Sequence, residues 1–367
     1  MFILMFLYSS LFQLTIAEEI NYTNNNTIIK IDNPYEHVDW QNYQQHKANF
    51  QTHTVNSDGI LTPAQAIKRY AELGYTVLSL TDHDDLNNYK TTWPWEAYGI
   101  EVETTEILAI QGNEISDTNH IVSLFNNYGG GSYSERLAFE EIRGKDGLAI
   151  FSHPGRYDES VEWYLDLFSK YEHLVGLEVY NQGDRYQYDR NLWDKLLSSL
   201  MPERPVWGFS NDDMHLPYHL GRNINILVIE KLSKKKVKES LKNGSFYFAY
   251  TPIVGDSFPE INNVIIEDNK ISLEIDQYEE IVWLGASSPD DIEDNQFSFA
   301  NRLNNVLKGI KELEPLYFLF PHNSSLEVAR GESVSFAEIE DLSYVRAVIK
   351  GKSGISYTQA FGIIKSE

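Results

Sequence analysis

Histidine, aspartate and glutamate side chains recur where short apolar segments of this chain stop. The sequence contains no cysteine, so any metal site must be built from imidazole, carboxylate or amide ligands. Borderline and hard divalent ions accept this mixture of nitrogen and oxygen. One histidine alone is more often structural, but ligand residues at several successive strand ends predict a metal site. The candidate ligands are Gln51, His53, Asp58, His83, Glu114, His120, His153, Asp213 and His215.

The spacing of these residues predicts that they face one another. Gln51 and His53 alternate along the chain, so in extended backbone both side chains project to one face. Asp213 and His215 alternate in the same way. The carboxylate of Glu114 could bridge two ions. We therefore expect one cluster that holds more than one cation.

Strand-like runs and amphipathic helical stretches alternate from about residue 47 to about residue 250. The stretch 62–74 is typical of a helix, with Thr62 as its N-cap, Pro63 in its first turn and Gly74 at its end. Such alternation predicts an α/β domain built on a parallel sheet or a barrel. In a β/α barrel the active site lies at the C-terminal ends of the strands, which is where the candidate ligands fall.

The sequence changes character after about residue 250. Short alternating runs are separated by turns, and "IEDNKI" and "IKGKSGI" are typical of hairpins. Residues 255–367 are therefore predicted to form a small antiparallel β domain that resembles a sandwich. Arg346 lies in its final part and is expected either to pack against the preceding domain or to contact a ligand.

The composition narrows the range of partners. The 367 residues include 30 lysines and arginines against 54 aspartates and glutamates, a formal net charge of -24. An acidic surface repels phosphate backbones, which argues against a long nucleic acid as partner. The sequence indicates no protein partner.

The first residues are uncharged and mostly apolar. Residues 1–17 are short for a membrane span, which needs about 20 residues, and are typical of a signal peptide. An uncleaved anchor is the alternative. We therefore predict export to the periplasm or the cell exterior, with residues 18–45 as an N-terminal extension. No later segment has the length and apolarity of a membrane span.

Several motifs together resemble those of a known family. "THTVNSDG", "LTDHDDL", "GNEI" with "NHI", "FSHPGR" and "NDDMH" are similar, in order, to the motifs of the PHP (polymerase and histidinol phosphatase) phosphoesterases. The resemblance covers about residues 46–250. It implies a distorted, TIM-like (β/α)7 barrel with two or three divalent ions at its mouth, usually manganese, iron or zinc, with magnesium possible.

The resemblance also implies roles for individual residues. The first ion would be held by His53, Glu114 and Asp213, with Gln51 in the place of the family's usual first histidine. The second would be held by Glu114, His120 and His153, and the third by Asp58, His83 and His215. Asp82 would orient a ligand or transfer a proton.

A phosphate also needs cationic side chains, and the sequence offers a few near the predicted mouth. Arg156 follows "SHPG" and Arg222 lies soon after His215, so both could bind the phosphate. For Arg156 and Arg222 a structural or surface role is the alternative. Arg185 and Arg190 flank an aromatic-rich segment that we expect to be a loop; this segment could line the substrate mouth, or its tyrosines could simply pack.

The implied activity is hydrolysis of a phosphomonoester or phosphodiester of a small molecule by a metal-bound hydroxide. Gln51 leaves three alternatives open. The site could keep three ions with an oxygen-rich first position, which favours manganese or magnesium over zinc, or it could work with two ions. Otherwise the chain would be a weak or inactive PHP barrel that serves as a binding module.

Overall fold

The computed structural model describes residues 22–24, 27–84, 91–100, 105–129, 133–292 and 326–366. The predicted signal peptide, residues 1–17, lies outside these ranges. No helix in the described part of the chain is long and apolar enough to cross a membrane.

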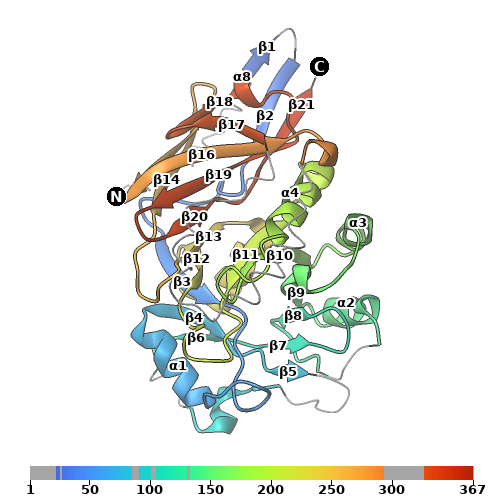
Figure 1. The fold of residues 1–367 in the computed structure, drawn as a ribbon, viewed down its shortest axis with the longest axis vertical. Coiled ribbons are helices and arrows are strands. Elements are labelled where there is room, and N and C mark those ends of the chain that lie inside the picture. The colour runs from blue at the N-terminus through green and yellow to red at the C-terminus, as the bar shows by residue number, and fades with distance from the viewer. Residues whose placement is uncertain are drawn as a thin grey trace, which may run out of the picture.

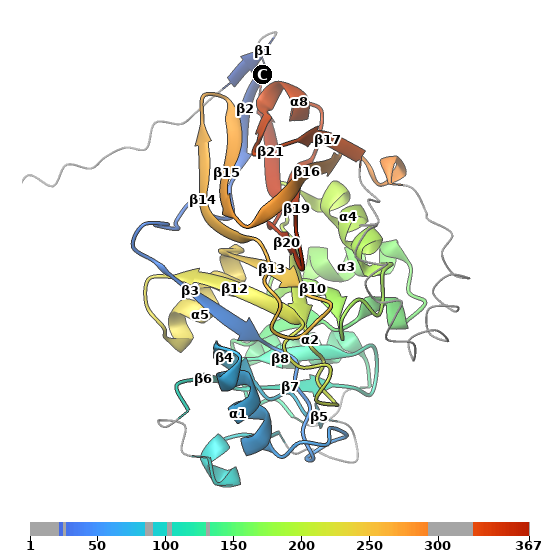
Figure 2. The ribbon, with the colours of Figure 1, turned by 60° about the vertical axis from the view of Figure 1, so that its left-hand side comes forward.

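The largest sheet runs the length of the molecule and includes strands from both ends of the chain (Figure 1 and Figure 2). Its order is β1 (Tyr22–Asn24), β2 (Thr27–Asp32), β21 (Phe361–Ser366), β19 (Tyr344–Gly351), β20 (Ile355–Tyr357), β13 (Phe246–Tyr250), β12 (Asn223–Ile229), β3 (Gln44–Asn49), β4 (Tyr75–Ser79) and β6 (Leu108–Ile110), with β16 (Tyr278–Ala286) between β19 and β17 (Leu326–Arg330).

Two smaller sheets complete the strand layers. One has the order β11 (Trp207–Asn211), β10 (Leu174–Asn181), β9 (Leu148–Phe151), β8 (Ile121–Leu124), β7 (Gly112–Ile115) and β5 (His83–Asp84). The other has the order β14 (Glu260–Glu267), β15 (Lys270–Asp276) and β18 (Ser333–Ser335).

Parallel and antiparallel pairs are mixed in the part that precedes residue 250. The pairs β3–β4, β4–β6, β5–β7, β9–β10 and β10–β11 are parallel, whereas β7–β8, β8–β9 and β12–β3 are antiparallel. The two larger sheets approach at an isolated parallel bridge between Thr52 and Met214. The pairing establishes a mixed α/β fold and does not establish closure into the expected seven-stranded barrel.

Helix α1 begins and ends where its local signals predict. The α-helices are α1 (Pro63–Glu72), α2 (Glu135–Gly144), α3 (Val161–Lys170), α4 (Asp189–Leu200), α5 (Lys234–Asn243) and α8 (Phe336–Ile339), and short 3-10 helices span Trp95–Tyr98, Pro154–Arg156 and Pro289–Asp291. In α1 the predicted cap is confirmed: the Thr62 hydroxyl accepts the Gln65 N–H, and Gln65 bonds back to the Thr62 backbone. Gly74 follows in the left-handed region, with φ of 78°.

The C-terminal strands are joined to the rest of the chain by hydrogen bonds. The predicted hairpins are confirmed: β14 pairs with β15 across Asp268 and Asn269, and β19 pairs with β20. Strand β20 pairs with β13, so the sheet is continuous across the predicted boundary at residues 250–255. Strand β2, from the predicted N-terminal extension, pairs with β21 (Figure 2).

Helix α4 carries the packing between these two parts. Trp193 of α4 lies in one core cluster with Tyr344 and Tyr357 of the C-terminal strands. Arg346 is 1% exposed, and its guanidinium donates to both carboxylate oxygens of Asp194 in α4 at 2.8 Å. Of the two predicted alternatives for Arg346, packing against the preceding domain is therefore confirmed.

Candidate metal centre

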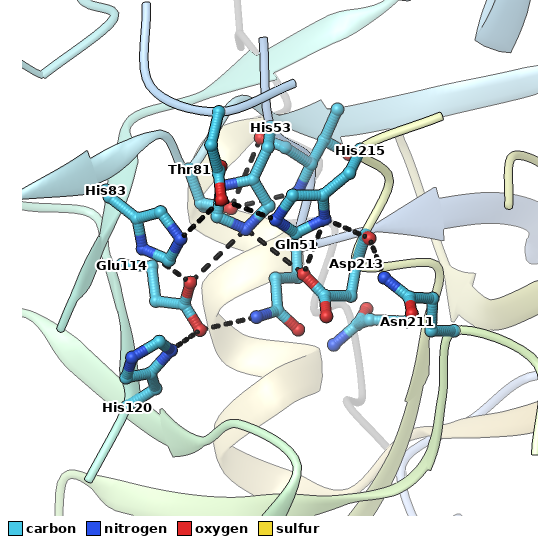
Figure 3. A network of polar contacts seen from close by, with 12 residues as sticks. Gln51, His53, Thr81, His83, Glu114, His120, Asn211, Asp213 and His215 are labelled. Atoms are coloured by element: carbon cyan, nitrogen blue, oxygen red, sulfur yellow. Dashed lines mark hydrogen bonds and ion pairs between the residues drawn. The ribbon is translucent and has the colours of Figure 1, made fainter. Parts of the chain in front are cut away.

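The predicted ligands come from separate segments and meet in one place (Figure 3). Glu114 lies at the centre of the cluster. Its Oε1 lies 3.1 Å from His120 Nδ1 and 3.3 Å from His153 Nε2. Its Oε2 lies 3.2 Å from His53 Nε2 and 3.1 Å from His83 Nδ1. One carboxylate thus contacts four imidazoles, two on each oxygen.

A second set of contacts extends the cluster toward solvent. Asp213 Oδ1 lies 3.1 Å from His53 Nε2 and 3.4 Å from His215 Nδ1. Asp58 Oδ2 lies 3.2 Å from His215 Nε2 and 3.5 Å from His83 Nε2. The side chain of Asp58 is 54% exposed, whereas that of Glu114 is completely buried. The cluster is therefore closed around Glu114 and open on the Asp58 side.

Three groups of these side chains bring one ligand atom each within 4.8 Å of the others. They are His53, Glu114 and Asp213; then His83, Glu114 and His120; then His53, Asp58, His83 and His215. The first is the set implied for the first ion without Gln51. The third contains the whole set implied for the third ion and adds His53. The second differs from the implied set because His83 takes the place of His153, which still contacts Glu114.

The buried nitrogen and oxygen atoms of the cluster are better suited to bind divalent cations than to form hydrogen bonds with one another. His53 Nε2, His83 Nδ1, Glu114 Oε2 and Asp213 Oδ1 are buried and have no hydrogen-bond partner among the described residues, although neighbouring pairs lie 3.1 to 3.2 Å apart. A buried polar atom without a partner is costly, so native proteins rarely keep one without a reason. Convergence of several such atoms, all of them metal-ligand types, provides that reason.

Mutual electrostatics stabilises the charged forms of Glu114 and His53, whereas burial lowers the pKa of His120. Burial alone would raise the pKa of Glu114, but His120, His153 and His53 hold that pKa well below its usual range. Burial alone would lower the pKa of His53, but Asp213 and Glu114 raise it well above the usual value. The carboxylates thus stay charged and attract positive charge, which a metal ion can supply in place of protons.

The backbone brings the ligands together by sharp turns as well as by strand geometry. His153 follows β9 with φ of 33° and Asp213 follows β11 with φ of 44°, both in the left-handed region that non-glycine residues seldom occupy. Because β11 ends at Asn211, Asp213 and His215 are not the alternating strand pair that the spacing predicts. Similarly, Glu114 lies inside β7 and not at the end of the preceding strand.

Asp82 organises the segment that carries Asp58. Its carboxylate accepts the Thr54 N–H at 2.6 Å, the Thr54 hydroxyl at 2.8 Å and the Ser57 hydroxyl at 2.8 Å, and it also contacts the Thr92 hydroxyl. Both oxygens are therefore occupied as acceptors. This arrangement supports the orienting role predicted for Asp82 over the proton-transfer role.

The arginines occupy different surroundings. Arg156 lies in the short helix after His153, with its guanidinium 5.8 Å from the ring centre of Tyr157. Arg222 is 8% exposed and donates to the Tyr250 hydroxyl at 3.0 Å, so its guanidinium is partly engaged in packing.

The expectation that Arg190 lies in a loop is wrong. It lies in α4, is 2% exposed and forms an ion pair with Asp184 at 2.6 Å. Arg185 does lie outside the helix, where its guanidinium donates to Gln182 at 3.0 Å and stands over the Tyr186 ring. The Gln182 amide in turn donates to the backbone carbonyl of Asp213.

The structure adds polar residues below the cluster that sequence reasoning missed. Glu178 is completely buried in β10; it accepts the backbone N–H of His153 at 2.8 Å and side-chain N–H groups of Asn181 and Asn211. Burial, and then the charge of Asp213, raise the pKa of Glu178 well above its ordinary value. A glutamate inside the apolar run "LVGLEVY" is the signal that could have identified it.

Gln51 is the predicted ligand whose contacts differ most from expectation. Its side chain is completely buried, and its amide nitrogen lies 2.6 Å from Glu114 Oε1. Figure 3 shows the Gln51 amide beside the Glu114 carboxylate, with His83 above the carboxylate and His120 below it. Gln51 therefore presents a hydrogen-bond donor, not a ligand atom, to the centre of the cluster.

Comparison with known proteins gives limited matches in sequence and broader ones in fold. No family model matches the chain. A stretch of 42 residues is 48% identical to part of an uncharacterized protein of Methanocaldococcus jannaschii and covers 11% of this chain and 19% of that protein. The chain thus aligns with less than a fifth of this relative's length.

Among solved structures, the chain is similar to a two-domain protein of Bacteroides vulgatus that contains a predicted PHP-like metal-dependent phosphoesterase. The identity is 16%, the TM-score is 0.49, and the match covers 88% of this chain and 96% of that one. A putative metal-dependent phosphoesterase of Bifidobacterium adolescentis is 16% identical over 54% of this chain and 96% of its own, with a TM-score of 0.37. The endonuclease Q of Pyrococcus furiosus is 14% identical over 54% of this chain and 56% of its own, with a TM-score of 0.40.

Proposed function

We propose that this chain is a metal-dependent phosphoesterase of the PHP type that acts on a small phosphorylated molecule. The observation that carries the proposal is the convergence on Glu114 of buried imidazole and carboxylate atoms that have no hydrogen-bond partner among the described residues. Divalent ions held there would neutralise phosphate charge and lower the pKa of a water molecule.

The open side of the cluster is where a substrate would enter. His83 and His215 are about one-fifth exposed and Asp58 is half-exposed, so these side chains meet solvent while Glu114 and His53 do not. A phosphate that approaches from this side reaches the ligands before it reaches the buried floor. Burial of the floor also keeps bulk water away from Glu114, which strengthens electrostatic interactions there.

Aromatic and basic side chains border the His153 side of the cluster. The rings of Tyr157 and Tyr186 lie 6.1 and 5.9 Å from the His153 ring. Arg156 stands over Tyr157 and Arg185 over Tyr186, at 5.8 and 5.0 Å. Two guanidinium groups beside flat rings suit a small organic phosphate, because the cations can pair with the phosphate and the rings can contact its organic part.

The net charge of -24 supports a small substrate over a long nucleic acid. A nucleic acid would bring many phosphates across an acidic surface, whereas a small ester brings its charge only to the cluster and the nearby arginines. This leaves the choice between monoester and diester to experiment.

The test uses the purified full chain. Its metal content is measured by mass spectrometry, and hydrolysis of p-nitrophenyl phosphate and bis-p-nitrophenyl phosphate is measured in the same sample with added Mn²⁺. We expect two or more ions per chain and turnover of one ester, both reduced in His153→Ala. The exposed His37 provides a matched control, and His37→Ala should behave as wild type.

Absence of bound metal together with absence of turnover in excess Mn²⁺ would overturn the proposal. The alternative, a PHP-type binding module without catalysis, is favoured by one observation, the donor that Gln51 presents to Glu114. Bound metal with no turnover of either ester or of a wider panel of small phosphates would favour that alternative.

A further inference from the structure

Gln51 has hydrogen bonds at both ends of its amide, and together they determine which atom faces the cluster. The Nε2 atom lies 2.6 Å from Glu114 Oε1, and Oε1 accepts from Asn181 Nδ2 at 3.1 Å. An ionised carboxylate can only accept, so a group this close to Glu114 must donate. The same logic holds at the other end, where the Asn181 amide nitrogen must meet an acceptor.

The position of Asn181 is fixed in turn by Glu178. The Asn181 amide nitrogen donates to Glu178 Oε2 at 2.8 Å as well as to Gln51, so it has an acceptor on two sides. Glu178 also accepts the Asn211 amide at 2.9 Å and the His153 backbone N–H at 2.8 Å. A buried chain of hydrogen bonds therefore runs from Glu178 through Asn181 and Gln51 to Glu114.

We infer that Gln51 is a positioning residue and not a metal ligand: held by Asn181, it donates to Glu114 and fixes the carboxylate shared by two of the ligand groups. This inference rests on the proposed function in that it assumes a metal centre at Glu114. It reduces the protein ligands of the first group to His53, Glu114 and Asp213. The remaining coordination positions of an ion there are left to water or substrate.

The competing role, coordination through Gln51 Oε1, requires the amide to turn. The turned amide would place Oε1 against Glu114 Oε1 and its NH₂ group against the NH₂ group of Asn181. Both hydrogen bonds would be lost. A cation bound by both oxygens would offset their approach, but the two NH₂ groups would still face each other in a buried site. The two roles therefore differ in what they require of Asn181: the positioning role needs its donor, and the ligand role does not.

The test measures Mn²⁺ binding to the metal-stripped full chain by isothermal titration calorimetry, without substrate. The variants are Gln51→Ala, Asn181→Ala and the double substitution. Partners that orient a ligand are worth roughly ten- to a hundred-fold in metal affinity, so we expect each single variant to weaken binding by that factor. The double variant should be no weaker than the weaker single variant, because both substitutions break the same chain.

The control is Asn126→Ala. Asn126 is also a buried asparagine, 5% exposed, but it bonds to the Ser123 hydroxyl and the Leu124 carbonyl. A general loss of packing would reduce the melting temperature of the metal-free protein in control and test variants alike, whereas a positioning role lowers Mn²⁺ affinity only in the test variants. Asn181→Ser provides a milder change if Asn181→Ala does not fold.

The outcomes separate this inference from the proposed function. Wild-type affinity in the Asn181 variants, together with loss of an ion in Gln51→Ala, would make Gln51 a ligand and overturn the inference. Wild-type affinity in Gln51→Ala would overturn it as well. A wild-type chain that binds no Mn²⁺ would overturn the proposed function itself. If the wild-type chain binds Mn²⁺ but hydrolyses no ester, the affinities of the variants still test the role of Gln51.

Discussion

Two buried carboxylates in this molecule, Glu114 and Asp194, differ in how far hydrogen bonds within the chain satisfy them and the groups around them. In the first, Glu114 and its imidazoles leave several atoms without a hydrogen-bond partner among the described residues. In the second, the carboxylate of Asp194 accepts from the Arg346 guanidinium on both oxygens and from the Tyr344 hydroxyl at 2.9 Å. Both carboxylates are completely buried.

The difference separates a structural ion pair from the candidate metal centre. The charge of Asp194 is neutralised by a partner from another part of the chain and both of its oxygens are occupied, so folding satisfies this carboxylate, although Arg346 Nη1 has no hydrogen-bond partner among the described residues. The cluster around Glu114 is not completed by folding, because its donor atoms converge on one another and suit a cation. Burial of charge alone therefore does not distinguish the two groups; the convergence of several metal-ligand atoms in the cluster around Glu114 does.

The largest effect on stability should come from breaking the completed group. Asp194→Ala leaves the Arg346 guanidinium buried without its carboxylate, which should lower the free energy of unfolding by about 3–5 kcal/mol. Denaturant unfolding of metal-stripped protein measures this. Metal content per folded molecule should stay at the wild-type value, since Asp194 is not part of the cluster.

Replacing both partners provides the control. Asp194→Leu with Arg346→Met removes the whole pair and leaves apolar side chains of similar volume, which is often neutral or even stabilising. Stability of the double variant near wild type, together with a large loss in Asp194→Ala, is the expected pattern. Equal loss in both variants would mean that packing, and not charge, dominates this region.

The next largest effect, a loss of Mn²⁺ affinity, should come from a substitution in the cluster around Glu114. Glu114→Gln keeps the shape of the side chain but removes the charge that two ligand groups share. Loss of a shared ligand should weaken Mn²⁺ binding by more than the roughly hundred-fold upper range for an outer partner. Calorimetric titration checks this, with Glu140→Gln, at a partly exposed position outside the cluster, as control. Without metal, the stability should change less than in Asp194→Ala, and a larger change would erase the distinction between the two groups.

A smaller loss of metal affinity is expected when a residue that holds the cluster in place, without being one of its ligands, is replaced. Asp82→Asn removes acceptor capacity that holds Thr54 and Ser57, so the segment that carries Asp58 should loosen. We expect about a ten-fold weaker affinity for the ion at the open side, with the ion beside His53, Glu114 and Asp213 retained. The number of Mn²⁺ ions bound per chain at limiting Mn²⁺ shows whether only the ion at the open side is lost. Loss of every ion would mean that Asp82 supports the whole cluster.

The parts of this picture that the sequence predicts are those with local signals. The cap at Thr62 and the end of α1 at Gly74 depend on neighbouring residues, and the structure confirms both. The ligand residue types are visible because each has its own chemistry. Helix α4 is less visible because the C-terminal strands cover it, so that even Arg190 and Asp194 are buried and the usual amphipathic pattern is lost.

The orientation of Gln51 could not be predicted because it depends on a residue far away in the sequence. Asn181 lies 130 residues further along the chain and determines which end of the amide faces Glu114. Glu178 was missed for a related reason: its acceptor role appears only when β9, β10 and β11 lie side by side. Sequence chemistry thus predicts most of the residues that meet around Glu114, whereas the hydrogen bonds that support them require the fold.

The smallest expected effect is on stability at acidic pH, and it comes from a buried histidine that belongs neither to the cluster around Glu114 nor to the Asp194–Arg346 pair. His46 in β3 is 8% exposed, and its Nδ1 lies 2.9 Å from the Thr76 hydroxyl. Burial lowers the pKa of His46 below its ordinary value. The unfolded chain then binds the proton more readily than the folded protein, so the stability due to this residue is present above about pH 6.5 and is lost as the pH falls below it.

His46→Gln should remove this part of the acid sensitivity. Denaturant unfolding of metal-stripped protein at about pH 7.5 and about pH 5.5 gives the loss of stability between the two conditions. We expect that loss to be slightly smaller in His46→Gln than in wild type, and unchanged in the exposed His37→Gln. A loss in His46→Gln as large as in wild type would assign the acid sensitivity to other groups, among them His173 and His219, because burial lowers the pKa of both.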